Sequence, residues 1–491
     1  MTRFPFHNTY ERLPERFFTR TSPTPVAAPR LIRLNTALAV ELGLDPEALA
    51  GDAGATVFAG NVLPENAEPI AMAYAGHQFG TFVRQLGDGR AILLGEVVDR
   101  SGIRRDIQLK GAGRTPWSRG GDGRAAVGPV LREYVVSEAM AALGIRTTRS
   151  LAAVTTGQPV IREEVVPGAV LTRVAASHVR VGTFQYFASR GDVEGVRLLA
   201  DYVIARHYPE AARAERPYHA LLAAVIDAQA ALIADWLLVG FIHGVMNTDN
   251  MSIAGETIDY GPCAFMDEYD TATVFSSIDL GGRYAYGNQP AIGAWNLTRL
   301  AECLLPLFSS DEDAAVAEAQ ETLSAYVPAF ERRYHAGLGR KLGLFTQQED
   351  DIALAQELLR AMQANKADFT LTFRALCDAA AGADGDAAVE SLFTDPAAVR
   401  EWLPRWRSRL EQEPAAPEER AAAMRKLNPA YIPRNHRAEA VIRAAVDEDD
   451  FGPFEELLTV LSRPYEEQPS FAEYARPPQE DQRVLQTFCG T

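Results

Sequence analysis

Cysteine is scarce in this chain of 491 residues, which contains only Cys263, Cys303, Cys377 and Cys489. Four scattered cysteines are too few for a disulfide scaffold or a cysteine-rich zinc site. An unpaired cysteine behaves as a small apolar side chain. We therefore expect Cys303 and Cys377 to be buried.

Long apolar runs are also missing. No uninterrupted stretch reaches the roughly 18 apolar residues that a membrane span needs. The first ten residues lack the basic and then apolar layout of a secretion signal. We therefore expect a cytoplasmic protein without a membrane partner.

Positive charge is in deficit, with 48 Lys and Arg residues against 65 Asp and Glu residues and a net charge of −17. This balance disfavours non-specific binding to nucleic acid or to an anionic membrane. A phosphate site must then be built locally from a few basic side chains. Apolar residues make up 47% of the chain, which at this length permits several folded units.

The segment 243–250 reads His-Gly-Val-Met-Asn-Thr-Asp-Asn, and Asp259-Tyr260-Gly261 follows shortly after it. His243 and Asn250 keep the interval of the phosphoryl-transfer pattern H-R-D-x-x-x-x-N. The catalytic acid of that pattern is replaced by Val245, which cannot accept a proton. We predict that Asp249 is a relocated base and that His243 orders its loop through backbone contacts.

Asn250 and Asp259 are predicted to bind a metal ion. Residues 251–253 and 257–259 have the composition of two short strands, and a hairpin between them would bring these two side chains together. Amide and carboxylate oxygens suit Mg²⁺ or Mn²⁺ that also contacts phosphates. The alternative is an ordinary polar loop after the helix predicted over 221–239.

Residues 82–110 have the pattern of three strands. Two apolar runs, 82–86 and 91–98, flank Asp88-Gly89, which is a strong hairpin signal. The third strand, 105–110, ends in Lys110. A helix is predicted over 130–143 from the spacing of its apolar residues.

A glycine turn, a strand lysine and a helix that carries an acid follow one another in a kinase small lobe. In that layout Lys110 holds phosphate oxygens, and Glu133 pairs with the lysine. Glu138 lies on the same helix and is the competing acid. Taken singly, each of these features is also common in ordinary hairpins and surface ion pairs.

The order of the elements predicts an α+β protein with a kinase-like two-lobe fold. We expect an N-terminal extension over 1–78, a small lobe over 79–175, a large lobe over 176–330 and a helical C-terminal region with a tail over 331–491. Helices are predicted over 314–327, 348–364 and 369–381. The Pro- and Glu-rich stretch 463–491 is expected to run extended over the surface.

Longer motifs resemble a known family. Residues 108–119 read Gln-Leu-Lys-Gly-Ala-Gly-Arg-Thr-Pro-Trp-Ser-Arg, with Gly-Asp-Gly-Arg at 121–124 and Arg-Glu-Tyr at 132–134. Other motifs are His-Gln-Phe-Gly at 77–80, the segment 243–251, Asp-Tyr-Gly-Pro at 259–262 and Asn-Gln-Pro at 288–290. Together they resemble the selenoprotein O family, which is called YdiU in bacteria, over nearly the whole chain.

The resemblance implies a kinase-like fold that transfers AMP from ATP to Ser, Thr or Tyr hydroxyls of proteins. ATP is expected in a flipped orientation with its α-phosphorus toward the acceptor, together with Mg²⁺ or Mn²⁺, and some members use UTP with Mn²⁺. The implied nucleotide contacts are Gly87, Gly89, Arg90, Lys110, Asp122 and Gly123, with Arg173 and Arg180 on the outer phosphates. The family also implies Asn250 and Asp259 as metal ligands and Asp249 as the general base.

Arg173 and Arg180 stand in largely apolar segments, where buried arginines need anionic partners. The phosphates of a nucleotide are one such partner, and surface carboxylates are the alternative.

The family places selenocysteine or cysteine at the position of Cys489. A terminal thiol is open to oxidation, so a bridge to Cys263 is one expectation, and an unlinked thiol on a frayed tail is the other.

Two other functions remain open from the sequence. One is a kinase that transfers the γ-phosphoryl group with Asp249 as its base, although Val245 argues against it. The other is a pseudoenzyme that binds nucleotide without reaction, although Lys110, Asn250 and Asp259 argue against it.

Overall fold

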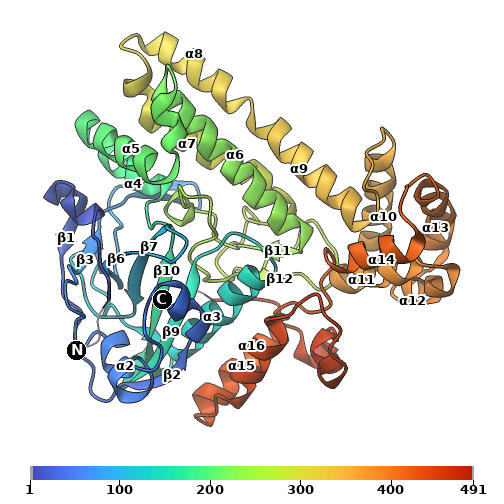
Figure 1. Ribbon diagram of the computed structural model, residues 1–491, viewed down its shortest axis with the longest axis horizontal. Coiled ribbons are helices and arrows are strands. Elements are labelled where there is room, and N and C mark those ends of the chain that lie inside the picture. The colour runs from blue at the N-terminus through green and yellow to red at the C-terminus, as the bar shows by residue number, and fades with distance from the viewer. Residues whose placement is uncertain (1–3, 489–491) are drawn as a thin grey trace.

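The computed structural model describes residues 4–488, which form a mixed α and β structure around an antiparallel sheet (Figure 1). The predicted α+β class is therefore confirmed. The eight-stranded sheet has β8 (Ala125–Ala126) paired with β10, and its other strands lie in the order β1 (Phe18–Arg20), β3 (Ile70–Met72), β6 (Ala91–Val98), β7 (Arg104–Lys110), β10 (Val165–Ala175), β9 (Arg149–Ile161) and β2 (Arg30–Leu34).

The two faces of the sheet are covered by different helices. One face packs on α1 (Thr36–Glu41) and α2 (Gly51–Phe58), and α3 (Val127–Ala142) packs against β9 and β10. Side chains alternate along a strand. Ile107 and Leu109 of β7 therefore enter the core under α1 and α2, while Lys110 is turned to the opposite side. Residues 4–78 thus contribute three strands to the sheet and two helices that pack on one of its faces.

The hairpin predicted at Asp88-Gly89 is wrong. β5 (Thr81–Val83) pairs with β4 (Gly76–Gln78) in a separate two-stranded sheet, whereas β6 pairs with β3 and β7. Asp88 is bound to the end of β3 instead, because its N–H donates to the Met72 carbonyl and its carboxylate accepts from the Met72 N–H, both at 3.0 Å. Gly87 has φ +77°, and a Cβ there would lie 2.5 Å from the Trp117 ring. The turn therefore follows a contact made far along the chain.

A helical layer follows the sheet. It contains α4 (Val181–Ala188), α5 (Val193–His207), α6 (Pro217–Leu238), α7 (Gln289–Phe308), α8 (Glu312–Leu323) and α9 (Tyr326–Lys341), with the small strands β11 (Phe241–Ile242) and β12 (Ala264–Phe265) between α6 and α7. By length and composition α6 could cross a membrane, but 67% of its apolar window is buried inside the protein. Such burial is typical of a core helix, so α6 is only weak evidence for a membrane-spanning helix.

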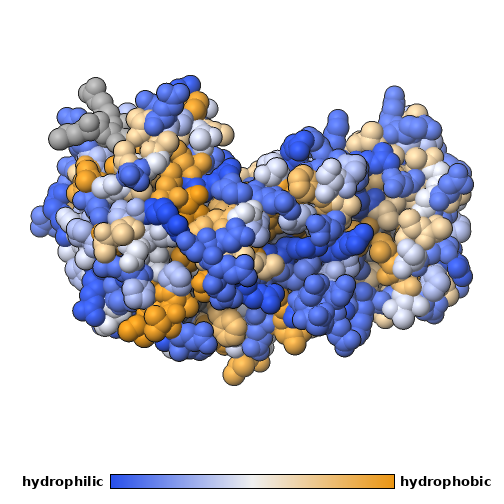
Figure 2. All heavy atoms as spheres, turned by 90° about the horizontal axis from the view of Figure 1, so that it is seen from below, coloured by the Kyte–Doolittle hydropathy of each residue, from blue (hydrophilic) through white to orange (hydrophobic). Residues whose placement is uncertain are grey.

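The C-terminal region is helical, as predicted. Its helices are α10 (Asp351–Asn365), α11 (Phe369–Ala379), α12 (Asp386–Glu390), α13 (Ala397–Leu410), α14 (Pro417–Arg425), α15 (Asn435–Asp447) and α16 (Gly452–Leu461). α10 to α14 form one end of the molecule, while α15 and α16 return to pack on α3 (Figure 1). Seen from below, the surface is hollowed between the body that holds the sheet and this helical end (Figure 2).

Two further predictions are corrected by the structure. The single helix expected over 314–327 is two helices, α8 and α9, because Pro328 in the first turn of α9 cannot continue a preceding helix. The hairpin expected over 251–259 is absent from the described structure. Ser252 instead bridges Arg180, and Thr257 bridges Thr147.

The predicted burial of Cys303 and Cys377 is confirmed. Cys263 is buried as well. Cys489 lies outside the described residues, so its link to Cys263 stays a prediction.

Candidate active site

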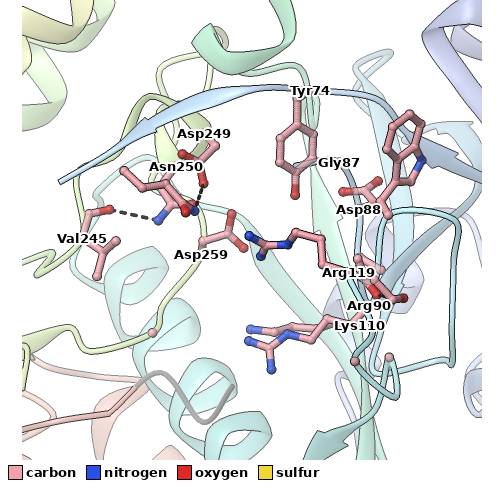
Figure 3. Close-up of a pocket in the computed structure, with 18 of the residues that line it drawn as sticks. Tyr74, Gly87, Asp88, Arg90, Lys110, Arg119, Val245, Asp249, Asn250 and Asp259 are labelled. Carbon is pink, nitrogen blue, oxygen red and sulfur yellow. Dashed lines mark hydrogen bonds between the residues drawn. The ribbon is translucent and has the colours of Figure 1, made fainter. Parts of the chain in front are cut away.

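A cavity of about 730 Å³ opens between the sheet and the segment that follows α6 (Figure 3). All of the predicted site residues except Glu133 line it, namely Gly87, Gly89, Arg90, Lys110, Asp122, Gly123, Arg173, Arg180, Asp249, Asn250 and Asp259. Figure 3 shows Asp249 and Asn250 on one wall and Arg90 and Lys110 on the opposite wall, with Asp259 between them. Residues from distant parts of the chain thus meet in one cavity.

Glu133 lies beneath the cavity and joins two of its cations. Its Oε2 is 2.5 Å from Lys110 Nζ, and its Oε1 is 2.5 Å from Arg173 Nε. Burial opposes ionisation of Glu133, but Arg173 and Lys110 outweigh it and hold its pKa below the usual value. Burial lowers the pKa of Lys110 to about 8, although Glu133 acts against this shift. Glu138, the competing acid, pairs with Arg149 at 2.7 Å instead.

Asp259 is the point where the cationic side chains converge. Its Oδ1 is 2.7 Å from Arg173 Nη2, and its Oδ2 is 2.6 Å from Arg180 Nη1. Burial alone would raise the pKa of Asp259, but Arg180, Arg173 and Lys110 hold it far below its usual range. The residue has φ +63°, a left-handed conformation that Asp tolerates better than most side chains. Asp259 is therefore a fixed carboxylate that stays ionised.

Asp249 differs from Asp259 in charge environment. It lies in the short turn Thr248–Asn250, and burial raises the pKa of its carboxyl to about 6. Oδ2 accepts a hydrogen bond from Gln78 Nε2 at 3.2 Å, and Oδ1 has no partner within the described part of the chain. A carboxyl with one uncommitted oxygen and a pKa near neutrality can accept a proton.

Asn250 presents its oxygen rather than its nitrogen to the cavity. Its Nδ2 donates to the Val245 carbonyl at 3.0 Å, so the amide oxygen remains for a cation. Over residues 4–488, no group of three or more His, Cys, Asp or Glu side chains is arranged to hold a metal ion. Mg²⁺ often uses only one or two protein ligands and completes its shell with water and substrate phosphates. Asn250 and Asp259 fit an ion of this kind.

The histidine of the motif has a structural place. His243 Nε2 is 2.9 Å from the Ile258 carbonyl oxygen, and the Val245 N–H donates to Nδ1 at 3.3 Å. These contacts confirm that His243 orders its loop through the backbone. Val245 is buried and lines the cavity at the position of the missing acid.

Asp122 and Gly123 lie in the glycine-rich loop at the rim. Asp122 forms a two-pronged ion pair with Arg162, at 2.9 and 3.1 Å. This pair is the main reason why the pKa of Asp122 is lowered. Arg162 also lines the cavity and had no role in the sequence-based prediction.

Sequence reasoning also missed the wall formed around β4. The Tyr74 ring lies 4.6 Å from the Arg180 guanidinium, in cation–π contact. Gln78 bonds Asp249, and a Cβ on Gly76 would lie 2.4 Å from Asp249 Oδ1. The signal in the sequence for this wall is the motif His-Gln-Phe-Gly at 77–80.

A cavity lined by a lysine, two buried arginines and three acid or amide side chains is typical of an enzyme site for a phosphorylated substrate. Comparisons with known proteins agree. The sequence model described as protein adenylyltransferase SelO matches residues 1–462. The chain therefore belongs to the SelO family of protein adenylyltransferases and is a nucleotidyltransferase.

Relatives from several bacteria carry the name protein nucleotidyltransferase YdiU. The chain is 70% identical to that of Bradyrhizobium sp. strain BTAi1, 68% to that of Rhodopseudomonas palustris strain BisB5 and 67% to that of Bradyrhizobium diazoefficiens. Each match spans 488 residues and covers 99% of both chains.

Proposed function

We propose that this protein transfers AMP from ATP to Ser, Thr or Tyr hydroxyls of other proteins. The observation that carries the proposal is a single cavity in which the buried cations Lys110, Arg173 and Arg180 surround Asp259. Asp249 lies in the same cavity with a raised pKa and an uncommitted oxygen. Such a site can anchor a triphosphate and deprotonate an acceptor.

In this proposal the fold is kinase-like, with a small lobe over 79–175, a large lobe over 176–330, an extension over 1–78 and a helical region over 331–491. Two observations support it. The buried Lys110–Glu133 pair joins a strand end to a helix, as in a kinase small lobe. Asn250 and Asp259 follow His243 in the order of the kinase catalytic segment.

The chain's own residues have separate tasks in the transfer. Lys110, Arg173 and Arg180 hold the β- and γ-phosphates, with Gly87, Gly89, Arg90, Asp122 and Gly123 as further nucleotide contacts. Asp249 takes the proton of the acceptor hydroxyl while the oxygen of that hydroxyl forms a bond to the α-phosphorus. The bond from that phosphorus to the bridging oxygen breaks, and pyrophosphate leaves. Mg²⁺ or Mn²⁺ held by Asn250 and Asp259 would neutralise charge on the phosphates.

Several finer assignments belong to the same proposal. UTP with Mn²⁺ is an alternative substrate, because the cationic side chains of the cavity suit the triphosphate that ATP and UTP share. We place the protein in the cytoplasm, with ATP and hydroxyl-bearing proteins as its partners and without nucleic acid or membrane. The net charge of −17 supports this choice of partners.

The test is which phosphate reaches protein. Incubation with Mg²⁺ or Mn²⁺ and ATP labelled at the α-phosphate should label the protein itself or an added protein, and γ-labelled ATP should not. Transfer of the γ-label that depends on Asp249 would instead identify a kinase. Tight ATP binding without transfer of either label would identify a pseudoenzyme.

A further inference from the structure

The end of the chain is fixed beside the cavity. Two short helical turns, Pro469–Ala475 and Glu480–Gln482, interrupt the stretch that we expected to be extended. Beyond them the Thr487 N–H donates to the Phe275 carbonyl at 2.7 Å, and its hydroxyl donates to the Pro262 carbonyl at 2.7 Å. Thr487 is 1% exposed. Pro262 lines the cavity, so the tail is anchored at the rim of the site.

The loop next to the tail is also held in place. The Ser277 N–H donates to the Thr487 carbonyl at 3.1 Å. The buried Asp279 carboxylate accepts from the N–H groups of Arg283 and Tyr284 at 2.9 and 2.8 Å. These bonds fix the turn that carries Leu280. The turn is therefore a defined surface feature.

The loop and the tail expose large apolar side chains that we call the mouth patch: Ile278, Leu280, Leu485 and Phe488, which are 58, 93, 76 and 63% exposed. Single exposed apolar residues are ordinary on a protein surface. These four come from two segments that are hydrogen-bonded to each other, and Ile278 also lines the cavity. One member of the mouth patch therefore lies in the candidate active site, and the other three lie on the two segments beside it.

We propose that the mouth patch docks the acceptor segment of the protein substrate, an extended stretch with apolar side chains near its Ser, Thr or Tyr. This inference rests on the proposed function. A hydroxyl that reaches Asp249 is carried by a polypeptide that must remain at the rim of the cavity. A segment that crosses the rim at Ile278 meets Leu280 on the same loop and the tail beside it. Burial of these side chains would supply binding energy away from the reacting atoms.

The experiment measures binding separately from transfer. Two fluorescent peptides share one Thr, flanked in one by Leu and Val and in the other by Gln and Asn. Fluorescence anisotropy is recorded with Mn²⁺ and an ATP analogue whose α,β-bridge is a methylene, so that no transfer occurs. The apolar peptide should bind about tenfold more tightly, and the double variant Leu280→Ser with Leu485→Ser should remove that advantage. Affinity for the nucleotide analogue should not change.

Ile103→Ser is the matched control. Ile103 is 48% exposed in the turn between β6 and β7, at the opposite end of these strands from Lys110, and its replacement should leave peptide binding unchanged. Removal of residues 485–491 should weaken binding of the apolar peptide. Tighter binding after this removal would overturn the proposal, because the tail would then cover the site.

Other outcomes also decide the question. Equal binding of both peptides to the unaltered protein, or no binding of either, would overturn the proposal. So would a patch variant that alters only self-association by light scattering, or only binding to phosphatidylcholine vesicles. If α-label reaches protein without dependence on the patch, docking fails and the proposed function stands. If the apolar peptide binds through the patch and α-label is never transferred, the proposed function fails.

Discussion

Two buried lysines show how differently the cavity and the helical region treat charge. Lys110 is 7% exposed and pairs with Glu133 at 2.5 Å. Lys341, at the end of α9, is 4% exposed and lies 4.5 and 5.6 Å from the rings of Phe373 and Phe369. Within residues 4–488 no carboxylate forms an ion pair with Lys341. Burial lowers the pKa of Lys110 to about 8 and that of Lys341 to about 7.

The difference teaches where charge is kept for function. In the cavity, Glu133 and Asp259 compensate buried cations, so these cations remain charged and held in place, as the proposed phosphate contacts require. In the helical region, the aromatic faces of Phe369 and Phe373 and a lowered pKa reduce the cost of burying Lys341. A change at Glu133 or Asp259 should therefore affect catalysis, whereas a change at Lys341 should affect stability without affecting catalysis.

The largest effect is expected from Asp259→Ala. It removes the carboxylate that fixes Arg173 and Arg180 and that we propose as a metal ligand. Transfer of α-label should fall by about two to three powers of ten, while circular dichroism shows a folded protein. Asp52→Ala, on the exposed start of α2, is the control. Near-normal transfer by Asp259→Ala would place the metal site elsewhere.

Glu133→Gln tests the paired lysine directly. The change leaves Lys110 and Arg173 without their shared counter-charge, and loss of one member of a buried ion pair costs about 3 kcal/mol or more. Urea unfolding and ATP affinity should both show the loss. Glu138→Gln is the matched control on the same helix, because its partner Arg149 is 29% exposed. Equal destabilisation by the two variants would contradict a special role for Glu133.

Lys341→Met should raise the free energy of unfolding, whereas Glu133→Gln should lower it. Methionine keeps most of the apolar stem and removes a buried amine, so the free energy of unfolding at pH 7 should rise by about 1 to 3 kcal/mol. Transfer activity should be unchanged. Urea unfolding monitored by tryptophan fluorescence measures the difference. A loss of stability would show that the contacts of the amine with Phe369 and Phe373 outweigh its burial.

The same lysine predicts a pH dependence of stability. Its pKa is about 7 in the folded protein, below the ordinary 10.5. Between these values the unfolded chain binds more protons, so stability should increase as the pH rises through this window. Lys341→Met should flatten the increase, although Lys110, whose pKa is also lowered, contributes in the same direction above about 8. Urea unfolding of both proteins at pH 7 and pH 9 isolates the Lys341 contribution, and parallel curves would contradict it.

Local pattern was enough for much of the fold. The strand that ends in Lys110 and the helix that carries Glu133 follow from side-chain alternation and helical spacing, and α3 occurs where the helix was predicted. The contact between these two residues was predicted from the kinase-like order of the elements, and it is present at 2.5 Å. Pro328 is the signal in the sequence for the break between α8 and α9, and apolar periodicity alone does not reveal that break.

Contacts between distant segments could not be predicted in this way. Gln78 and Asp249 are 171 residues apart, and the wall around β4 forms only when these segments meet. The carboxylate of Asp88 binds the end of β3, which overrides the local preference of Asp-Gly for a hairpin. The apolar periodicity and the motifs do not show that Asp259 is shared by Arg173 and Arg180.

The smallest effect is expected from Val245→Asp, which restores the acid of the kinase pattern. Val245 lines the cavity, but Lys110, Arg173 and Arg180 are untouched by the change. We propose that these cations decide which phosphorus faces the acceptor, so transfer of γ-label should remain absent. Val245→Asp combined with Asp249→Asn also removes the base that we propose and sharpens the test. Transfer of γ-label by this double variant would mean that the position of the base, rather than phosphate anchoring, selects the reaction.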